Sequence, residues 1–369
     1  MFLLIAISFG GPLVMSVVLT ALVRQWSIRR GFIDRPGGHK QHDRPVALGG
    51  GIAIAASVIV PVLAGAAAAW AVAGGGRAPP AGWPSIIAVH ASGAASKLPQ
   101  AAGIMLGAVV LHVVGLIDDR RPLGPWPKFA AQFAAAFWVS GVLGLRAVQV
   151  LGPLPSAIVT AVWIVLITNA FNFLDNIDGL SAGVGAIASI ILAVTAVRAG
   201  QVFVPAMALA LAGALTGYLF FNFPPARIFM GDAGSLVIGY LLGVLTILTT
   251  YYDPRLGLSP VGVAVPVLVL SVPLYDVISV VTHRVRLGLS PLKGDRRHFS
   301  HRLVRKGMSV RGAVLTIYLA TAATGLSAIA LPRVGGAEAA LLLGQCVLIV
   351  VMIAVLEHVP GRHENRADG

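Results

Sequence analysis

Apolar segments long enough to cross a bilayer recur along this whole chain, and they limit its possible folds more than any other feature. The mean hydropathy is +0.87 and only 11% of the residues are charged, which excludes an ordinary soluble domain. Because a helix needs about 20 apolar residues to span the hydrocarbon core, we predict an all-α, polytopic bundle of about 11 transmembrane helices. The predicted spans are 1–23, 48–69, 101–117, 128–144, 156–173, 181–198, 204–221, 236–250, 263–281, 312–331 and 339–357.

The basic residues predict the orientation of these spans. With the N-terminus outside, 21 of the 27 Lys and Arg residues fall in inner loops or the C-terminal tail, as cytoplasmic segments require. We therefore predict a multi-pass protein of a bacterial-type inner (plasma) membrane with a cytoplasmic C-terminus. Residues 1–23 lack the basic start of a signal peptide, so we expect this span to be retained. The net charge of +13 suits anionic lipids and substrates, and without a nucleic-acid motif we expect no nucleic-acid partner.

One membrane domain is predicted over residues 1–357, because no loop is long enough to hold a core of its own. Residues 70–100 are rich in Ala, Gly and Pro and predict an irregular insertion on the outer face. Residues 144–155 predict a small outer hairpin, and 358–369 a polar C-terminal tail. Cys346 is the single cysteine, which excludes disulfides within the chain and metal sites built from cysteines.

The few acidic residues gather at the predicted inner ends of the spans. Asp118 and Asp119 end the third span, and Lys128 and Gln132 lie one helical turn apart on the next. Adjacent carboxylates repel unless a cation or a shared proton intervenes, so the pair suits a divalent metal or a catalytic base. A solvated helix end with its own counter-charges is the plain alternative.

A second polar group interrupts the apolar segment that ends near residue 180. Asn169, Asn172 and Asn176 recur at helical spacing, with Asp175 beside them and Asp178 following. Such side chains are costly in lipid unless they line a wet site. The alternative is a hydrogen-bonded seam between helices, which would not favour two carboxylates.

Two further loops carry candidate ligand-binding residues. In the first, Asp232 lies between glycines that let the backbone approach a ligand, and Arg227 offers a partner for phosphate, although a plain turn is the simpler interpretation. The second is a basic loop with His298, His301 and Arg302, which we interpret as an anion clamp rather than a membrane-surface patch with incidental histidines. With carboxylate and amide oxygens as the available donors, Mg²⁺ or Mn²⁺ is favoured over zinc. Another basic loop, the first along the chain, covers residues 34–51; it includes His39 and ends in Gly49-Gly50-Gly51.

Together these segments resemble the polyprenyl-phosphate N-acetylhexosamine-1-phosphate transferase family, which includes the phospho-MurNAc-pentapeptide transferases. The resemblance runs from about residue 34 to about residue 307 and keeps the order and spacing of the motifs. The motifs are Asp118-Asp119 with Lys128 and Gln132, NAFNFLDNIDGLS at 169–181, IFMGDAGSL at 228–236 and SPLKGDRRHFSHRL at 290–303.

The resemblance implies roles for individual residues. It implies that Asn172 and Asp232 are ligands of Mg²⁺, with Mn²⁺ as a substitute, and that Asp118 or Asp119 deprotonates or positions the lipid phosphate. The expected substrate-binding residues are Lys128, Asn169, Asp175, Asp178, Arg227, His298, His301 and Arg302. The implied reaction moves a sugar 1-phosphate from a UDP-N-acetylhexosamine to polyprenyl (undecaprenyl) phosphate and releases UMP, by direct attack or through a covalent aspartyl intermediate.

Departures from the family pattern favour one branch. His298 and His301 are separated by Phe299-Ser300, whereas the peptidoglycan branch carries three consecutive histidines, and LDNIDGL replaces TDGLDGL. We therefore favour UDP-GlcNAc as donor, with the phospho-MurNAc-pentapeptide transferase reaction as the runner-up. An ion-coupled transporter is the rival from another class, but its carboxylates should lie near the bilayer midplane. A homodimer is compatible with the sequence.

Overall fold

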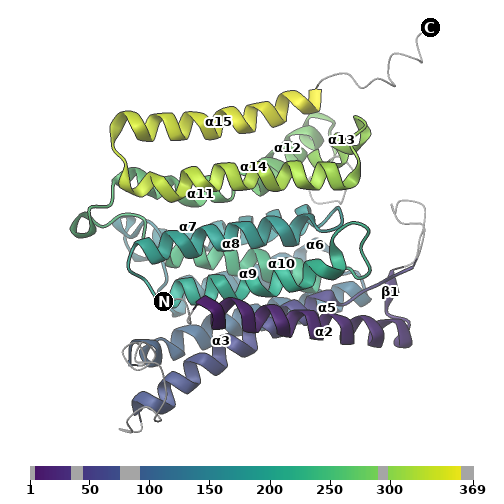
Figure 1. The fold of residues 1–369 in the computed structure, drawn as a ribbon, viewed down its shortest axis with the longest axis horizontal. Coiled ribbons are helices and arrows are strands. Elements are labelled where there is room, and N and C mark those ends of the chain that lie inside the picture. Colours follow the sequence, from purple (N-terminus) through teal and green to yellow (C-terminus); the bar gives the residue numbers. More distant parts are fainter. Residues whose placement is uncertain (1–4, 35–44, 75–91, 290–297, 359–369) are drawn as a thin grey trace.

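The computed structural model describes residues 5–34, 45–74, 92–289 and 298–358, and it confirms the predicted all-α membrane fold. Long helices lie roughly side by side in a bundle (Figure 1). The first half of the bundle consists of η1 (Ala6–Gly10), α2 (Gly11–Arg30), α3 (Gly50–Gly74), α5 (Leu98–Arg120), α6 (Pro125–Phe137), η2 (Trp138–Val142) and α7 (Pro153–Leu174). The second half consists of α8 (Leu180–Arg198), α9 (Phe203–Asn222), α10 (Asp232–Leu248), α11 (Val265–Val269), α12 (Ser271–Arg286), α13 (Phe299–Arg305), α14 (Val310–Ala330) and α15 (Gly336–His358).

Every predicted span coincides with a helix or a pair of consecutive helices. Within the described residues, eight helices are long and apolar enough to cross a membrane. The pair 260–269 and 271–286, bent by 63°, makes a ninth if it is one broken span. Helix α10 has only 17 residues, and α6 continues into the short π-helical η2. The count of about 11 therefore stays a prediction, and so does the orientation in the membrane.

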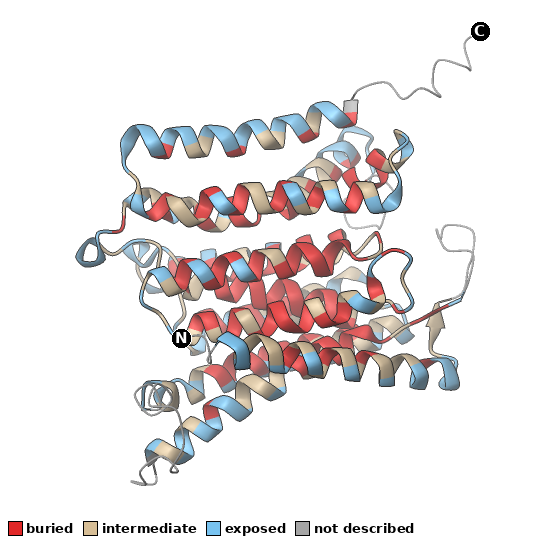
Figure 2. Ribbon diagram, in the orientation of Figure 1, coloured by how far each residue is buried: buried red, intermediate tan, exposed pale blue. Residues whose placement is uncertain are grey.

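Helix α10 is the centre of the bundle, and the helices at its edge face outward. Nearly every residue of α10 is buried, and it packs against α5 and α7. In contrast, only 17% of the most apolar stretch of α2 with η1, and of α15, is buried (Figure 2). Exposed apolar side chains on the outer helices suit contact with lipid tails, which are as apolar as the side chains themselves.

The loops that carry the sequence motifs meet at one end of the bundle. In Figure 1 the N-terminus lies at the opposite end from β1 (Ile33–Asp34) and α13. Hydrogen bonds join the end of α5 to the start of α10, the last turn of α7 to α10, and the loop after α7 to α13. The prediction that these loops share one face is therefore confirmed.

Two local predictions differ from the structure. The segment predicted to be irregular is helical at its flanks, because the alanine-rich stretch before Gly74 favours helix and α5 begins at Leu98; residues 75–91 lie outside the described residues. The predicted hairpin over 144–155 is wrong. A 3₁₀ turn, η3 (Gln149–Leu151), stands there, and Pro153 then starts α7, a position where proline is well suited.

The strands that the structure describes lie elsewhere, in a two-stranded antiparallel sheet. It pairs β1 with β2 (Val46–Ala47), at the base of the first basic loop. Of the calls made from sequence, His39, the part of the last basic loop over 290–297 and the tail 359–369 lie outside the described residues.

Candidate active site

The segment that precedes α10 is held like an extra strand against the start of α3. Ala47 forms a parallel bridge with Ile228, and the amide nitrogen of Phe229 donates to the carbonyl of Ala47 at 2.8 Å. The amide of Gly50 donates back to the carbonyl of Phe229 at 2.9 Å. Asp232, three residues after Phe229, therefore takes its position from a part of the chain far away in sequence.

Two buried side chains at the end of α9 hold the same segment. The carbonyl of Ile228 accepts from the Asn222 amide at 2.9 Å and from the Tyr218 hydroxyl at 3.0 Å. Asn222 Oδ1 also accepts from the amide of Gly179 at 2.9 Å. The loop before α8 and the segment before α10 are thereby joined through one asparagine.

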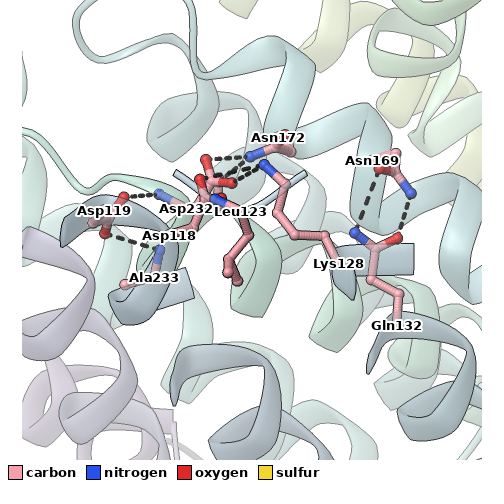
Figure 3. Close-up of polar contacts among 10 residues, drawn as sticks. Asp118, Asp119, Leu123, Lys128, Gln132, Asn169, Asn172, Asp232 and Ala233 are labelled. Carbon is pink, nitrogen blue, oxygen red and sulfur yellow. Dashed lines mark hydrogen bonds and ion pairs between the residues drawn. The ribbon is translucent and has the colours of Figure 1, made fainter. Parts of the chain in front are cut away.

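Asp119 caps the N-terminus of α10. Its two oxygens accept from the amides of Asp232 at 2.8 Å and Ala233 at 3.2 Å (Figure 3). A carboxylate is favourable there because the first amides of a helix lack partners and carry partial positive charge. Gly231 has φ of +66°, and a Cβ on it would lie 2.4 Å from Asp119 Oδ1, so glycine is required. Asp119 therefore positions the backbone of Asp232.

Asp118, its neighbour, faces a different group. The ammonium of Lys128 lies 3.3 Å from Asp118 Oδ2 and 2.9 Å from Asp232 Oδ2 (Figure 3). The other Asp118 oxygen accepts from the amide of Leu123 at 2.7 Å. These side chains stay partly accessible, at 23% for Lys128, 15% for Asp118 and 22% for Asp232. One cation thus bridges two carboxylates that a ligand can reach.

Asn172 and Asp175 complete this group, which we call the acidic cluster (Asp118, Asp119, Lys128, Asn172, Asp175 and Asp232). Asn172 Nδ2 donates to Asp232 Oδ1 at 2.8 Å and to Ser235 Oγ at 2.9 Å. Asp175 follows the last residue of α7, and its burial raises its pKa well above the ordinary value, with the charges of Asp232, Asp119 and Asp178 adding to the rise. Of the four carboxyl groups in this cluster, the Lys128 ammonium therefore contacts two.

The remaining residues of the asparagine motif have other partners. Asn169 Nδ2 donates to Gln132 Oε1 at 2.5 Å and to the carbonyl of Val165 at 2.8 Å, so it joins α7 to α6 one turn away from Asn172. Asp178 Oδ2 accepts from the amide of Ala226 at 2.8 Å, which ties two loops of this face together. The predicted substrate-binding roles of both residues stay predictions.

A second polar group surrounds α13, and we call it the paired cluster (Asp276, His298, Arg302 and Glu357). His298 Nδ1 donates to Asp276 Oδ2 at 2.8 Å, and the amide of Phe299 donates to Asp276 Oδ1 at 3.1 Å. Asp276 is wholly buried. The ring of His298 packs edge-on against Phe173 of α7, with centroids 5.8 Å apart.

The other predicted residues of the basic loop lie close by. The His301 ring centroid is 6.2 Å from that of His298. The Arg302 guanidinium donates to Ser279 Oγ and pairs with Glu357 Oε2 at 2.8 Å. Arg227 is exposed on the loop before α10. Their contacts with a substrate stay predictions.

Sequence reasoning did not assign roles to several residues that the structure brings into these clusters. Ser235 bonds Asn172, and Ser300 donates to Asn176 Oδ1 at 2.7 Å. Asp276 and Glu357 hold the basic loop from α12 and α15. The signal that could have found the last two is a carboxylate inside an apolar helix, which is rare without a partner or a function.

Comparison with known proteins shows the family of this chain. Residues 101–250 match the model of glycosyl transferase family 4. A probable undecaprenyl-phosphate N-acetylglucosaminyl 1-phosphate transferase of Bacillus subtilis (strain 168) is 32% identical over 337 residues, which cover 89% of this chain and 85% of the relative. A decaprenyl-phosphate N-acetylglucosaminephosphotransferase of Mycolicibacterium smegmatis is 31% identical, covering 91% of this chain and 84% of the relative.

A more distant relative is the undecaprenyl-phosphate alpha-N-acetylglucosaminyl 1-phosphate transferase of Escherichia coli (strain K12), 27% identical over 79% of this chain and 74% of its own length. The helices of membrane-spanning length and the similarity to these relatives define the class, a multi-pass membrane enzyme that transfers a sugar phosphate. Within this class, the chain belongs to glycosyl transferase family 4, so the resemblance inferred from the motifs is confirmed.

Proposed function

We propose that this enzyme transfers N-acetylglucosamine 1-phosphate from UDP-GlcNAc to undecaprenyl phosphate or a related polyprenyl phosphate, at the cytoplasmic face of a bacterial inner membrane. The observation that carries the proposal is the acidic cluster, in which Lys128 bridges Asp118 and Asp232 at the end of the bundle where the basic loops lie. The names of the relatives in Bacillus, Mycolicibacterium and Escherichia, all N-acetylglucosamine phosphate transferases, support the same reaction.

The acidic cluster fits Mg²⁺, although no group of three or more His, Cys, Asp or Glu in the described part of the chain forms a metal site by itself. Mg²⁺ commonly takes only one or two carboxylates and completes its shell with water and substrate phosphates. Asp232 Oδ1 and the Asn172 amide face each other at 2.8 Å, and turning the amide would present its oxygen there. We therefore assign Asp232 and Asn172 as the residues that hold Mg²⁺, with Mn²⁺ suited to the same oxygens.

The surroundings also favour a cation. Lys128 already places positive charge between two carboxylates, and within the described residues the other two carboxyl groups of the cluster form no ion pair. When bound, the metal would neutralise the diphosphate and the departing nucleotide. The ammonium of Lys128 would bind the phosphate of one substrate beside it.

The reaction needs little covalent help from the protein. An oxygen of the acceptor phosphate attacks the phosphorus that carries the sugar, and a new P–O bond forms. The bond from that phosphorus to the oxygen shared with the nucleotide phosphate breaks, and UMP leaves with the electron pair. Because a phosphate monoester has a second pKa of about 6, the acceptor is largely a dianion at neutral pH and attacks directly.

The two adjacent aspartates take different parts in this scheme. Asp118 lies beside Lys128, where it can position the acceptor phosphate or take a proton from an acceptor that arrives singly ionised. Asp119 accepts hydrogen bonds from two backbone amides of α10, so we propose that its role is to position Asp232. Positioning and neutralisation of charge then supply most of the rate enhancement.

We assign binding of the donor nucleotide-sugar to α13 and the residues around it. His298, directly before α13, packs against Phe173, and His301 of α13 lies beside His298. Ser300 of α13 donates to Asn176, four residues beyond Asn172. Ser300 is completely buried, so a histidine in its place would need additional room. The separation of His298 from His301 and the N-acetylglucosaminyl 1-phosphate transferases among the relatives support UDP-GlcNAc over the pentapeptide donor. A homodimer stays a prediction.

The test is a panel of radiolabelled UDP-sugars with the purified protein, undecaprenyl phosphate and Mg²⁺. We expect a lipid-linked GlcNAc diphosphate and UMP, with UDP-GlcNAc used in preference to UDP-MurNAc-pentapeptide. Preference for the pentapeptide donor would assign the protein to the other branch of the family. Release of UDP instead of UMP would overturn the reaction type.

A further inference from the structure

Helix α15 contacts the rest of the bundle along one narrow stripe. Its buried residues are Ala339, Cys346 and Ile353, seven apart, followed by Glu357. Residues seven apart lie on the same face of a helix, and the other faces of α15 are mostly exposed (Figure 2). The stripe therefore ends in a carboxylate whose side chain is only 2% exposed.

A buried carboxylate needs a partner, and Glu357 has one on α13. Its Oε2 lies 2.8 Å from a guanidinium nitrogen of Arg302, which also donates to Ser279 on α12. Removing one member of such a pair leaves the other charge buried without compensation. The ion pair between Arg302 and Glu357 thus joins α13 to α15.

The opposite end of α13 is fastened to α12. Asp276 accepts from His298 Nδ1 and from the amide of Phe299, and the Phe299 ring packs edge-on against Tyr275 with centroids 5.9 Å apart. With only seven residues, α13 is too short to be stable as an isolated helix. Its position therefore depends on these contacts with α12 and α15.

We infer that Glu357 is a positioning residue for the donor nucleotide-sugar: through Arg302 it holds α13 so that His298 and His301 stand beside the acidic cluster. This inference rests on the proposed function. It assigns Arg302 a role as the link between α13 and α15, in place of direct contact with the substrate. Substitutions at Glu357 should then act on donor binding, although the residue is remote from the acidic cluster in sequence and belongs to the outermost helix.

The kinetic test compares Glu357→Gln with Glu338→Gln, an exposed glutamate at the other end of α15. We expect Glu357→Gln to raise the KM for UDP-GlcNAc by roughly ten- to a hundredfold, because misplacing a binding element costs about that much. We expect kcat and the KM for undecaprenyl phosphate to change less than about twofold by the same reasoning, because the acidic cluster is intact. Glu357→Asp, which keeps the charge, should lie between wild type and Glu357→Gln.

A double-mutant cycle shows whether Arg302 and Glu357 act on donor binding together or independently of each other. If Arg302 acts through Glu357, Arg302→Ala with Glu357→Ala should raise the donor KM no more than Arg302→Ala alone. Additive effects of the two substitutions, or a donor KM unchanged in Glu357→Gln, would overturn the inference.

A measurement without turnover keeps the inference independent of the proposed reaction. Val304, half-buried on α13, is replaced by cysteine in a Cys346→Ser protein, and the rate of maleimide labelling is followed. We expect Glu357→Gln to speed the labelling at least about fivefold while Glu338→Gln leaves it unchanged, since local opening exposes the thiol. Equal labelling rates would refute the link. A wild-type protein that does not use UDP-GlcNAc would instead refute the proposed function and leave the labelling result valid.

Discussion

The acidic cluster and the paired cluster lie at the same end of the bundle but balance their charges differently. In the acidic cluster, the ammonium of Lys128 contacts two of the four carboxyl groups, those of Asp118 and Asp232. In the paired cluster, Asp276 accepts hydrogen bonds from His298 and from the amide of Phe299, and Glu357 pairs with Arg302. Like charges gathered at one site call for an added cation or a bound proton, whereas a buried carboxylate paired with a guanidinium depends on keeping that partner.

The difference in charge balance indicates that the acidic cluster binds ligands and that the paired cluster holds the structure in place. The acidic cluster is partly accessible, and its uncompensated charge suits it to a metal and the phosphates that the metal binds. The paired cluster is buried, and its contacts hold a short helix in place. Substitutions in the first cluster should therefore change activity with little loss of stability, and those in the second should change stability and donor binding.

The largest expected effect is the loss of transfer when a metal ligand is removed. We predict that Asp232→Asn and Asn172→Ala lower transfer by about a thousandfold or more, comparable to the removal of a key electrostatic group. The midpoint of thermal unfolding should not fall for Asp232→Asn, because repulsion among the carboxylates decreases. EDTA should inactivate the wild type, and added Mg²⁺ should restore it.

Asp253→Asn, in the loop at the opposite end, is the matched control and should stay fully active. An Asp232→Asn protein with wild-type rates in saturating Mg²⁺ would refute the assignment of Asp232 as a metal ligand. It would also refute the proposed difference in role between the two clusters.

The next effect divides two neighbouring aspartates. We predict that Asp118→Asn lowers kcat by about 10²- to 10³-fold, the range for a group that handles a proton or positions the nucleophile, with little change in donor KM. Asp119→Asn keeps one acceptor for the amides of α10, so we expect a smaller loss of kcat and a stability loss of about 1 kcal/mol, as for a weakened N-cap. Rates and thermal unfolding of both variants check this. If Asp118→Asn weakens only the affinity for UDP-GlcNAc, the pair binds the donor.

A third prediction tests the paired cluster. Asp276→Ala leaves His298 Nδ1 and the amide of Phe299 without their acceptor, and we expect a stability loss of about 3 kcal/mol, since each unsatisfied buried group costs about 1–3 kcal/mol. Asp276→Asn retains an acceptor and should lose less. The donor KM should rise in both, as it should in His298→Ala. A fully stable Asp276→Ala protein would mean that α13 is held by other contacts.

The smallest effect concerns the pH dependence of stability. The pKa of Asp175 in the folded protein is raised from its ordinary value of 3.8, mainly by burial, so the folded state binds this proton more tightly than the unfolded state. The stability due to this proton is present below pH 3.8 and is lost as the pH rises through the folded pKa. Asp175→Asn should therefore be more stable than wild type at pH 7 and similar in stability near pH 4.

Thermal unfolding between pH 4 and pH 8 measures this difference. The control is Asp253→Asn, because hydrogen bonds from Arg255 lower the pKa of Asp253 and its side chain is in contact with solvent. A wild type and an Asp175→Asn protein with parallel pH profiles would show that Asp175 is solvated in the folded state.

The sequence alone determined the membrane fold, the helices and the residues of the acidic cluster. Apolar length predicts spanning helices because lipid leaves no other partner for the backbone, and Asp118, Asn172 and Asp232 stand out because polar groups in such segments are rare. Short-range exceptions escaped this reasoning: the 144–155 segment forms a 3₁₀ turn, and β1 and β2 are too short to give a periodic signal.

Only the tertiary structure decided what each polar residue contacts. Asp118 and Asp119 are identical in sequence terms, yet one faces Lys128 and the other caps α10, because adjacent side chains on a helix point in different directions. Glu357 lies 55 positions beyond Arg302 in the chain, and nothing local pairs them. Hydropathy reports the free energy of placing a side chain in lipid, whereas the partner of a polar atom depends on which helices pack together.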